Sequence, residues 1–87
     1  MNTFPVKIVS ADNVAVEYTA ISLVVPAGLG YAGILANHAP FISCLKPGKI
    51  FLKTADSGPL TLELLSSGFL KVLDNAVTIV ADQVKNP

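Results

Sequence analysis

The sequence predicts a small all-β domain, an antiparallel β-sandwich made of many short strands. Three observations point to this fold class. Apolar and polar residues alternate along most of the chain, which places successive side chains on opposite faces of a strand. Gly, Pro, Asn, Asp and Ser interrupt this alternation at short, regular intervals, as in a sandwich or barrel. No window of helical length carries an apolar stripe at helical spacing without a Gly or Pro inside it.

Period-two alternation marks the expected strands. It is carried by Phe4, Val6 and Ile8; by Val14, Val16 and Tyr18, continued by Ile21, Leu23 and Val25; by Ile50 and Leu52; by Leu60, Leu62 and Leu64; and by Val77 and Ile79. Turn-forming residues separate these segments at positions 12–13, 27–33, 37–40, 46–48, 56–59, 66–68 and 74–75. Within the strands, Leu62 and Ile79 are expected core positions.

Residues 1–87 are expected to form one domain with a single core. A chain of 87 residues buries roughly 60–65% of the surface of its unfolded form, which suffices for one core. Hydrophobic residues make up 52% of the chain and charged residues only 14%, against roughly 25% in an average domain. With so few charges, part of the apolar surface is expected to face a partner protein, although a compact core also uses apolar residues.

The distribution of charge argues against nucleic acid as a partner. The net charge is zero, the six lysines are scattered from Lys7 to Lys85, and there is no arginine. Without arginine the chain also lacks the usual bidentate group for phosphates and carboxylates. We therefore expect neither nucleic acid nor a small-molecule substrate.

The sequence carries no mark of export or membrane insertion. Residues 1–7 lack the basic and apolar regions of a signal peptide, and no apolar run approaches the ~18 residues of a membrane span. Cys44 is the only cysteine, so no intrachain disulfide is possible, which fits a reducing compartment. We expect a soluble, cytoplasmic protein with indirect membrane association, in which Cys44 is a small buried apolar residue.

The segment Gly28-Leu29-Gly30-Tyr31-Ala32-Gly33 matches the glycine spacing of a dinucleotide-binding loop. That site needs a helix beginning within the loop and an acidic residue about twenty positions later. Pro40 leaves too little room for the helix, and there is no acid between Glu17 and Asp56. We interpret the segment as a glycine-rich bend between strands.

The sequence around His38 and Cys44 does not indicate a metal site or a nucleophilic pair. A metal site needs at least three converging ligands, and a nucleophilic pair needs a recognisable motif around the cysteine. The acidic residues fall mostly in turns or on the polar side of strands. We expect His38 to be a packed or interface residue, and we expect no catalysis, no cofactor and no metal.

The order and spacing of several segments are typical of one known family. These segments are Val6-Lys7-Ile8-Val9-Ser10, Val24-Val25-Pro26, Gly33-Ile34-Leu35, Asn37-His38-Ala39-Pro40, Leu45-Lys46-Pro47-Gly48, Ser67-Gly68-Phe69-Leu70-Lys71-Val72 and Asn75-Ala76-Val77-Thr78-Ile79-Val80-Ala81-Asp82. Together they resemble the N-terminal β domain of the epsilon subunit of F-type ATP synthase, over essentially the whole chain.

The resemblance implies a flattened sandwich of about ten short antiparallel strands. It also implies a non-catalytic subunit of the central rotor stalk, bound to the gamma subunit and seated on the ring of c subunits. Such a subunit couples the ring to gamma in proton-driven ATP synthesis and has no bound cofactor. It would lie at the cytoplasmic face of the cell membrane, attached through the synthase complex and not inserted directly.

Site residues follow from the resemblance position by position. Gly30, Tyr31 and Ala32 are expected at the contact with the c ring. Ser10, His38 and Ser43 are expected near the rotor interfaces with gamma.

Two departures from the family pattern affect these expectations: the first is the replacement of acidic residues, and the second is the length. The family usually has acidic residues in the bend, where this chain has Leu29 and Tyr31, so a ring contact would use apolar and aromatic burial. In the Gly-Phe-Leu strand Lys71 replaces a common acid. The missing acids favour one alternative, a free-standing β-sandwich interaction module of the same fold outside the synthase.

The second departure concerns length. Most family members continue into a two-helix C-terminal domain, which in bacterial enzymes can inhibit ATP hydrolysis. The sequence reaches Pro87 directly after the closing strand. A protein that ended there is expected not to inhibit through inserted helices.

Overall fold

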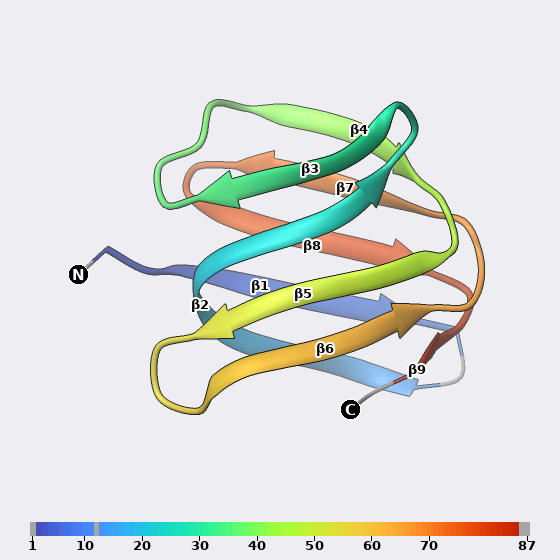
Figure 1. Ribbon diagram of the computed structural model, residues 1–87, viewed down its shortest axis with the longest axis horizontal. Helices are drawn as coiled ribbons and strands as arrows, with labels where there is room; N and C mark the ends of the chain where they lie inside the picture. The colour runs from blue at the N-terminus through green and yellow to red at the C-terminus, as the bar shows by residue number, and fades with distance from the viewer. Residues whose placement is uncertain (1, 12, 86–87) are drawn as a thin grey trace.

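Nine β-strands and no helix form the part of the chain that the computed structural model describes, residues 2–11 and 13–85 (Figure 1). The strands are β1 (Phe4–Ser10), β2 (Asn13–Ala27), β3 (Gly30–Leu35), β4 (Phe41–Leu45), β5 (Gly48–Thr54), β6 (Gly58–Leu64), β7 (Gly68–Leu73), β8 (Ala76–Ala81) and β9 (Val84–Lys85). The predicted all-β class is confirmed, with nine strands described in place of about ten. The side chain of Val14 and the whole of Asp12 lie outside the described residues.

The strands form two layers that share β2. In the front layer of Figure 1 the order is β3, β2, β5, β6 and β9, and in the back layer it is β2, β1, β8, β7 and β4. The first half of β2 pairs with β1, and its second half pairs with β5 and β3. At the end of β2, Ala27 also pairs with Leu45 of β4. A single long strand therefore joins the two sheets along one side.

A β-bulge at Ile21 lets β2 pass from one layer to the other. Ala20 pairs with Thr54 and Ser22 with Lys53, so Ile21 is the extra residue between them. Ala20 is buried before the bulge, and Leu23 and Val25 are buried after it. The alternation predicted from Tyr18 to Val25 thus changes phase by one residue, because a bulge reverses which parity faces the core.

One strand pair differs from the predicted antiparallel arrangement. β1 and β8 are parallel, in a register that runs from Val6 with Val77 to Ser10 with Ala81. Parallel neighbours need a crossover connection, and here the whole of β2 to β7 provides it. The other pairings among the described strands are antiparallel.

The core lies between the two layers and is apolar. Every strand from β1 to β8 contributes at least one buried side chain to one cluster, and the predicted core residues Leu62 and Ile79 are both in it. The one buried polar side chain among the described residues is Thr54, whose hydroxyl donates to Gly58 O at 2.8 Å and accepts from Ser57 N–H at 2.9 Å. Each strand therefore has one face in the core and leaves its alternate residues on an outer face.

The sandwich has two ends, which differ in the turns they carry. The end with the β2–β3 turn is called the hairpin end, and the end with the β7–β8 turn is called the Asn75 end (Figure 1). At the Asn75 end, Asn75 Nδ2 donates to Thr3 O at 3.1 Å, and Asn37 N–H donates to Asn75 Oδ1 at 2.6 Å. One side chain thus connects the chain before β1, the β3–β4 connection and the β7–β8 turn.

Among residues 2–11 and 13–85 there is no helix with the length and apolar character needed to cross a membrane.

Candidate functional site

The tip of the β2–β3 hairpin is the most exposed apolar point of the described chain. The turn consists of only Gly28 and Leu29, and the Leu29 side chain is 107% exposed. A Cβ added at Gly28 or Gly30 would meet no atom within 4 Å. The predicted glycine-rich bend is therefore a two-residue turn between antiparallel strands, shorter than expected because Gly30 already belongs to β3.

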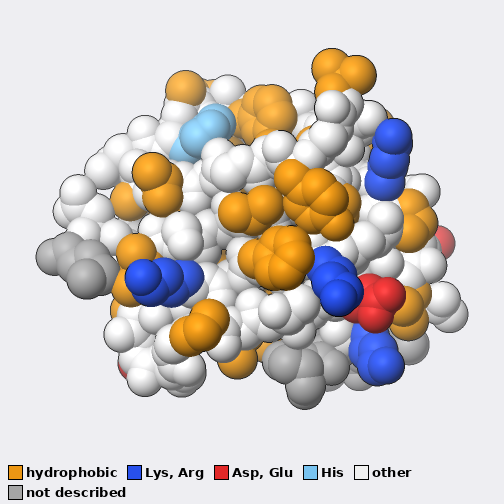
Figure 2. Space-filling view, viewed as in Figure 1, with side chains coloured by type: hydrophobic (Ala, Val, Ile, Leu, Met, Phe, Trp, Pro, Cys, Tyr) orange, Lys and Arg blue, Asp and Glu red, His pale blue; other side chains and the backbone are white. Residues whose placement is uncertain are grey.

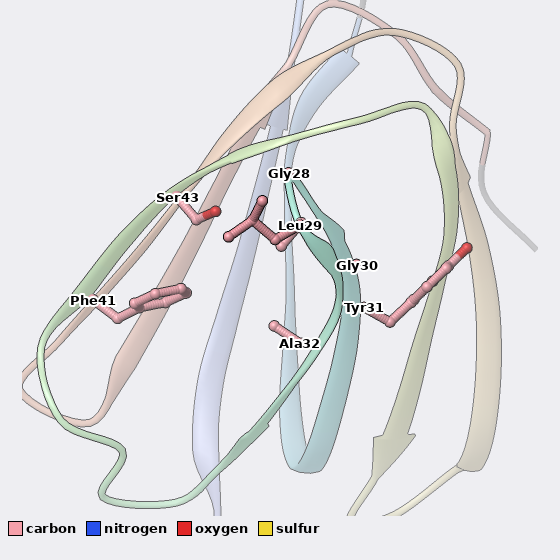
Figure 3. A pocket seen from close by; sticks show the side chains of 8 residues that line it. Gly28, Leu29, Gly30, Tyr31, Ala32, Phe41 and Ser43 are labelled. Carbon is pink, nitrogen blue, oxygen red and sulfur yellow. The ribbon is translucent and has the colours of Figure 1, made fainter.

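Beside this tip lies an open hollow of about 350 Å³ (Figure 3). It is lined by Ala27, Gly28, Leu29, Gly30, Tyr31, Ala32, Phe41 and Ser43. None of these residues is charged, so the surface can exclude water only against a partner that is also largely uncharged. The hollow opens between β3, which pairs only with β2, and β4 of the other layer.

Tyr31 points away from the other labelled side chains of the hollow (Figure 3). It lies on the outer face of β3, and its hydroxyl accepts a hydrogen bond from Lys49 N–H at 3.4 Å. Its ring is 6.1 Å from the ring of Phe51, at an interplanar angle of 44°. The hydroxyl also lies 3.2 Å from the position of a Cβ on Gly48. Tyr31 thus packs partly against the outer face of the front sheet, while Leu29 at the tip is fully exposed.

A second apolar surface covers the outer side of β4, β7 and β8. Phe69 is paired with Cys44 on one side and Val80 on the other, and Val80 is paired with Val9 of β1. Phe69 is 60% exposed and Ile42 is 74% exposed. We call this surface the β4–β7–β8 face and define it by Ile42, Cys44, Phe69, Lys71, Leu73 and Val80. Across it, Cys44, Phe69, Val80 and Val9 form a cross-strand row of apolar side chains that the core does not use.

Cys44 is exposed, so the prediction that it is buried was wrong. In β4 the buried Leu45 faces the core, and the period of two then places Cys44 on the outer face. The outer face of β7 and β8 could have been predicted from the alternation in the sequence. Once Ile79 is assigned to the core, Val80 must point outward, and the same rule applies to Phe69 beside the buried Leu70.

The front layer has apolar side chains on its outer side as well. Figure 2 shows hydrophobic side chains gathered over the middle of this layer, with lysines around them. Phe51 lies there between Val24 and Thr61 in register, in contact with Tyr31. Because these side chains already pack on one another, this region is less open than the β4–β7–β8 face.

The residues predicted for the rotor interfaces do not lie together. Ser10 ends β1 at the hairpin end, and His38 lies in the β3–β4 connection at the Asn75 end. Ser43 lines the hollow, together with the predicted ring residues Gly30, Tyr31 and Ala32. The structure therefore groups Ser43 with the hairpin and separates Ser10 from His38.

No reactive cluster is found within the described ranges. Groups of three or more His, Cys, Asp or Glu side chains suited to a metal are absent there. His38 packs against Phe41 with ring centroids 5.8 Å apart, and its Nδ1 is 2.7 Å from Ala39 O. Cys44 lies on an outer face in the row with Phe69. These contacts agree with a packed histidine.

Comparison with known proteins settles the family. The family described as ATP synthase, Delta/Epsilon chain, beta-sandwich domain matches residues 3–87. The chain belongs to this family. The resemblance inferred from the sequence is thereby confirmed.

Relatives in this family include two bacterial ATP synthase epsilon chains. That of Thioalkalivibrio sulfidiphilus is 42% identical over 80 residues, which are 92% of this chain and 57% of the relative. That of Latilactobacillus sakei is 42% identical over 78 residues, or 88% of this chain and 54% of the relative. The chain therefore spans a little over half the length of these relatives.

Two solved structures share the fold. One is a chain in the mitochondrial ATP synthase of Euglena gracilis, in an OSCP/F1/c-ring assembly, with a TM-score of 0.83 and 19% identity over 93% of this chain and 51% of that one. The other is a chain in the central stalk and c ring of the Tetrahymena thermophila enzyme, with a TM-score of 0.77 and 13% identity over 94% and 65%. At these identities the likeness supports the sandwich fold alone.

Proposed function

We propose that this chain is a non-catalytic part of the central stalk of an F-type ATP synthase. In this role it couples the c ring to the gamma subunit in proton-driven ATP synthesis, with no cofactor, nucleic acid or small-molecule substrate. It lies at the cytoplasmic face of the cell membrane, held there by the synthase complex. The family supports this assignment, since the relatives are ATP synthase epsilon chains.

The observation that carries the proposal is the presence of two separate apolar surfaces on one compact sandwich. A coupling part must bind two partners at once, and it transmits motion best when a packed core lies between the contacts. The hairpin tip with its hollow is one surface, and the β4–β7–β8 face is the other. The intervening core is a single cluster of buried side chains.

The hairpin end is the proposed contact with the c ring. Gly30, Tyr31 and Ala32 were expected there, and the geometry adds Leu29 as the residue that projects farthest. Gly30 and Ala32 border the hollow, whereas Tyr31 supports the hairpin from the outer face of the sheet. The contact would then consist of an apolar anchor and an adjacent apolar hollow in place of ion pairs.

The β4–β7–β8 face is the proposed contact with gamma. Its central row ends at Val9 on one side and at Cys44 on the other. The chain neighbours of these two residues are Ser10 and Ser43, which were expected near gamma, but adjacent side chains of a strand point to opposite faces, so their assignment to this contact comes from the resemblance. His38 lies three residues before β4, and its assignment to the same contact comes from the resemblance.

Binding to each partner separately tests the proposal. We expect Leu29→Asp to weaken binding to the detergent-solubilised cognate c ring at least about tenfold and to leave gamma binding unchanged. Phe69→Asp should weaken gamma binding at least about tenfold and leave binding to the ring unchanged. Thr61→Asp, on the exposed outer side of β6, is the matched control and should change neither. Wild-type protein that bound neither gamma nor the ring would contradict the proposal.

The second candidate is a free-standing interaction module outside the synthase. The uncharged hairpin favours it, because the acids usual in the family bend are missing there. The same two binding measurements distinguish the candidates. A module outside the synthase would bind neither partner, and its Leu29 and Phe69 variants would behave like wild type.

A further inference from the structure

We propose that Lys71 determines which surface can cover the β4–β7–β8 face: a mostly apolar partner surface with one carboxylate that meets the Lys71 ammonium. The proposal rests on the proposed function, because it takes gamma as the partner to be tested. It goes further by assigning a charge to that partner and a specificity role to one residue of this chain.

Lys71 lies in the middle of the apolar face. It is the fourth of six residues in β7 and is paired with Ile42 of β4 and Thr78 of β8. On the same face its neighbours along β7 are Phe69 and Leu73. Three of these four neighbours are exposed large hydrophobic side chains. A partner that buries Phe69 and Ile42 must therefore cover Lys71 too.

Most of the other strand lysines have an acid beside them in register, and Lys71 has none. Lys7 is paired with Glu17, and Glu63 is paired with both Lys49 and Lys85. These are opposite-charge cross-strand pairs, which stabilise a sheet modestly. Lys71 has only Ile42 and Thr78 across the strands. No acid therefore lies opposite Lys71 in register on either neighbouring strand.

Burial of this charge requires a counter-charge from outside. An ammonium that is covered by apolar groups loses its hydration, and its one polar cross-strand neighbour, Thr78, is uncharged. The lysine stem can extend some distance along the surface toward water. However, β4 and β8 flank Lys71 on both sides, and Phe69 and Leu73 lie before and after it. A carboxylate on the partner is the group that offsets the burial.

Lys53 provides a matched control on the opposite layer. It too has no acid across the strands, being paired with Ser22 and Pro59. It lies beside Phe51 along β5, but only one residue before the end of that strand. Because it borders the turn, its ammonium can stay in water even when a partner covers Phe51. A charge reversal at Lys53 therefore tests for a general charge effect.

The experiment measures the affinity of full-length variants for purified cognate gamma. We expect Lys71→Arg to bind within about threefold of wild type, since the charge is retained. Lys71→Gln should bind at least about thirtyfold more weakly and Lys71→Glu more weakly still, because each leaves the partner carboxylate buried without a cation. Lys53→Glu should bind like wild type. Thermal unfolding of each variant verifies that it is folded.

Zero-length carbodiimide cross-linking tests the contact directly. This reagent joins an amine to a carboxyl group only when the two touch, so we expect a Lys71–Asp or Lys71–Glu cross-link to gamma by mass spectrometry. The Lys71→Arg variant should keep its affinity and lose this cross-link. If gamma binds wild type and all Lys71 variants equally, or if no Lys71 cross-link forms in the complex, the inference is wrong while the proposed function stands. If wild type does not bind gamma, the proposed function itself fails.

Discussion

The β2–β3 turn, Gly28-Leu29, and the β7–β8 turn, Asp74-Asn75, each join antiparallel strands with two residues, but their surroundings differ. Asp74 and Asn75 have φ values of 51° and 60°, the left-handed pair of a type I′ turn, and Asn75 hydrogen-bonds two other segments. Leu29 is fully exposed, and its neighbouring glycines have open space where a Cβ would be. The Asp74-Asn75 turn helps to hold the chain together, whereas the Gly28-Leu29 turn is free to contact a partner.

The two turns suggest a practical rule for this fold. A polar turn whose side chain bonds to distant backbone contributes to stability, and it should be sensitive to substitution in the isolated protein. An apolar turn without internal contacts should be sensitive only in a complex. The following changes test that rule, in order of decreasing effect on unfolding.

The largest effects are expected in the strands that leave the two turns. Ile79 on β8 and Ile34 on β3 are both buried in the same core. We expect Ile79→Ala and Ile34→Ala each to lower the free energy of unfolding by about 2–5 kcal/mol, measured by urea denaturation. The comparison would fail if Ile34→Ala cost far less than Ile79→Ala, since the free turn would then mark a loosely packed end and not a contact.

Asn75→Ala is expected to cost about 1–3 kcal/mol. It removes the acceptor of Asn37 N–H and the donor to Thr3 O, and it puts a Cβ residue without a polar side chain at positive φ. Asn75→Gly relieves the backbone conformation and separates the two contributions. If both variants unfolded like wild type, the hydrogen bonds at this end would contribute nothing to stability.

Tyr31→Glu is expected to cost about 1 kcal/mol or less. The variant loses the contact with Phe51 and the hydroxyl that receives Lys49 N–H, but position 31 is already 58% exposed. Chemical denaturation measures the difference. A loss of several kcal/mol would mean that Tyr31 holds the hairpin in place and belongs functionally with the core.

Leu29→Ser is expected to change the unfolding free energy by about 0.5 kcal/mol at most, because the side chain is wholly exposed. Its effect should appear only in ring binding. A clear destabilisation in the isolated protein would show that the tip packs internally, and the contrast between the turns would then be lost.

The sequence predicts the strands and turns of this protein well, because the core faces of most strands keep an uninterrupted period of two. Leu62 and Ile79 follow that rule, and both are buried. The apolar positions change from even to odd between Tyr18 and Ile21, but the sequence alone does not show that a bulge causes this, since a bulge depends on how β2 pairs with two different sheets. The parallel β1–β8 pair also depends on the topology and leaves no local pattern.

The candidate sites were predicted less completely than the fold. The hairpin was found from its glycines, but the sequence did not separate Leu29 at the tip from Tyr31 on the sheet, which depends on where the turn begins. The exposure of Cys44 was missed, because a cysteine is compatible with either face of a strand and only its register with Leu45 decides. The Asn75 hydrogen bonds join segments far apart in the sequence, so no local pattern predicts them.

The parallel pairing of β1 and β8 has a consequence for how the chain folds. Val6 pairs with Val77, which is far from it in the sequence, so one side of β1 stays unpaired until β8 is available. Such distant contacts come late, because the loop they close must first lose much of its conformational entropy. On the ribosome β1 can form a hairpin with β2 early, but its second edge stays open until β8 emerges. Completion of the back sheet therefore waits for β8.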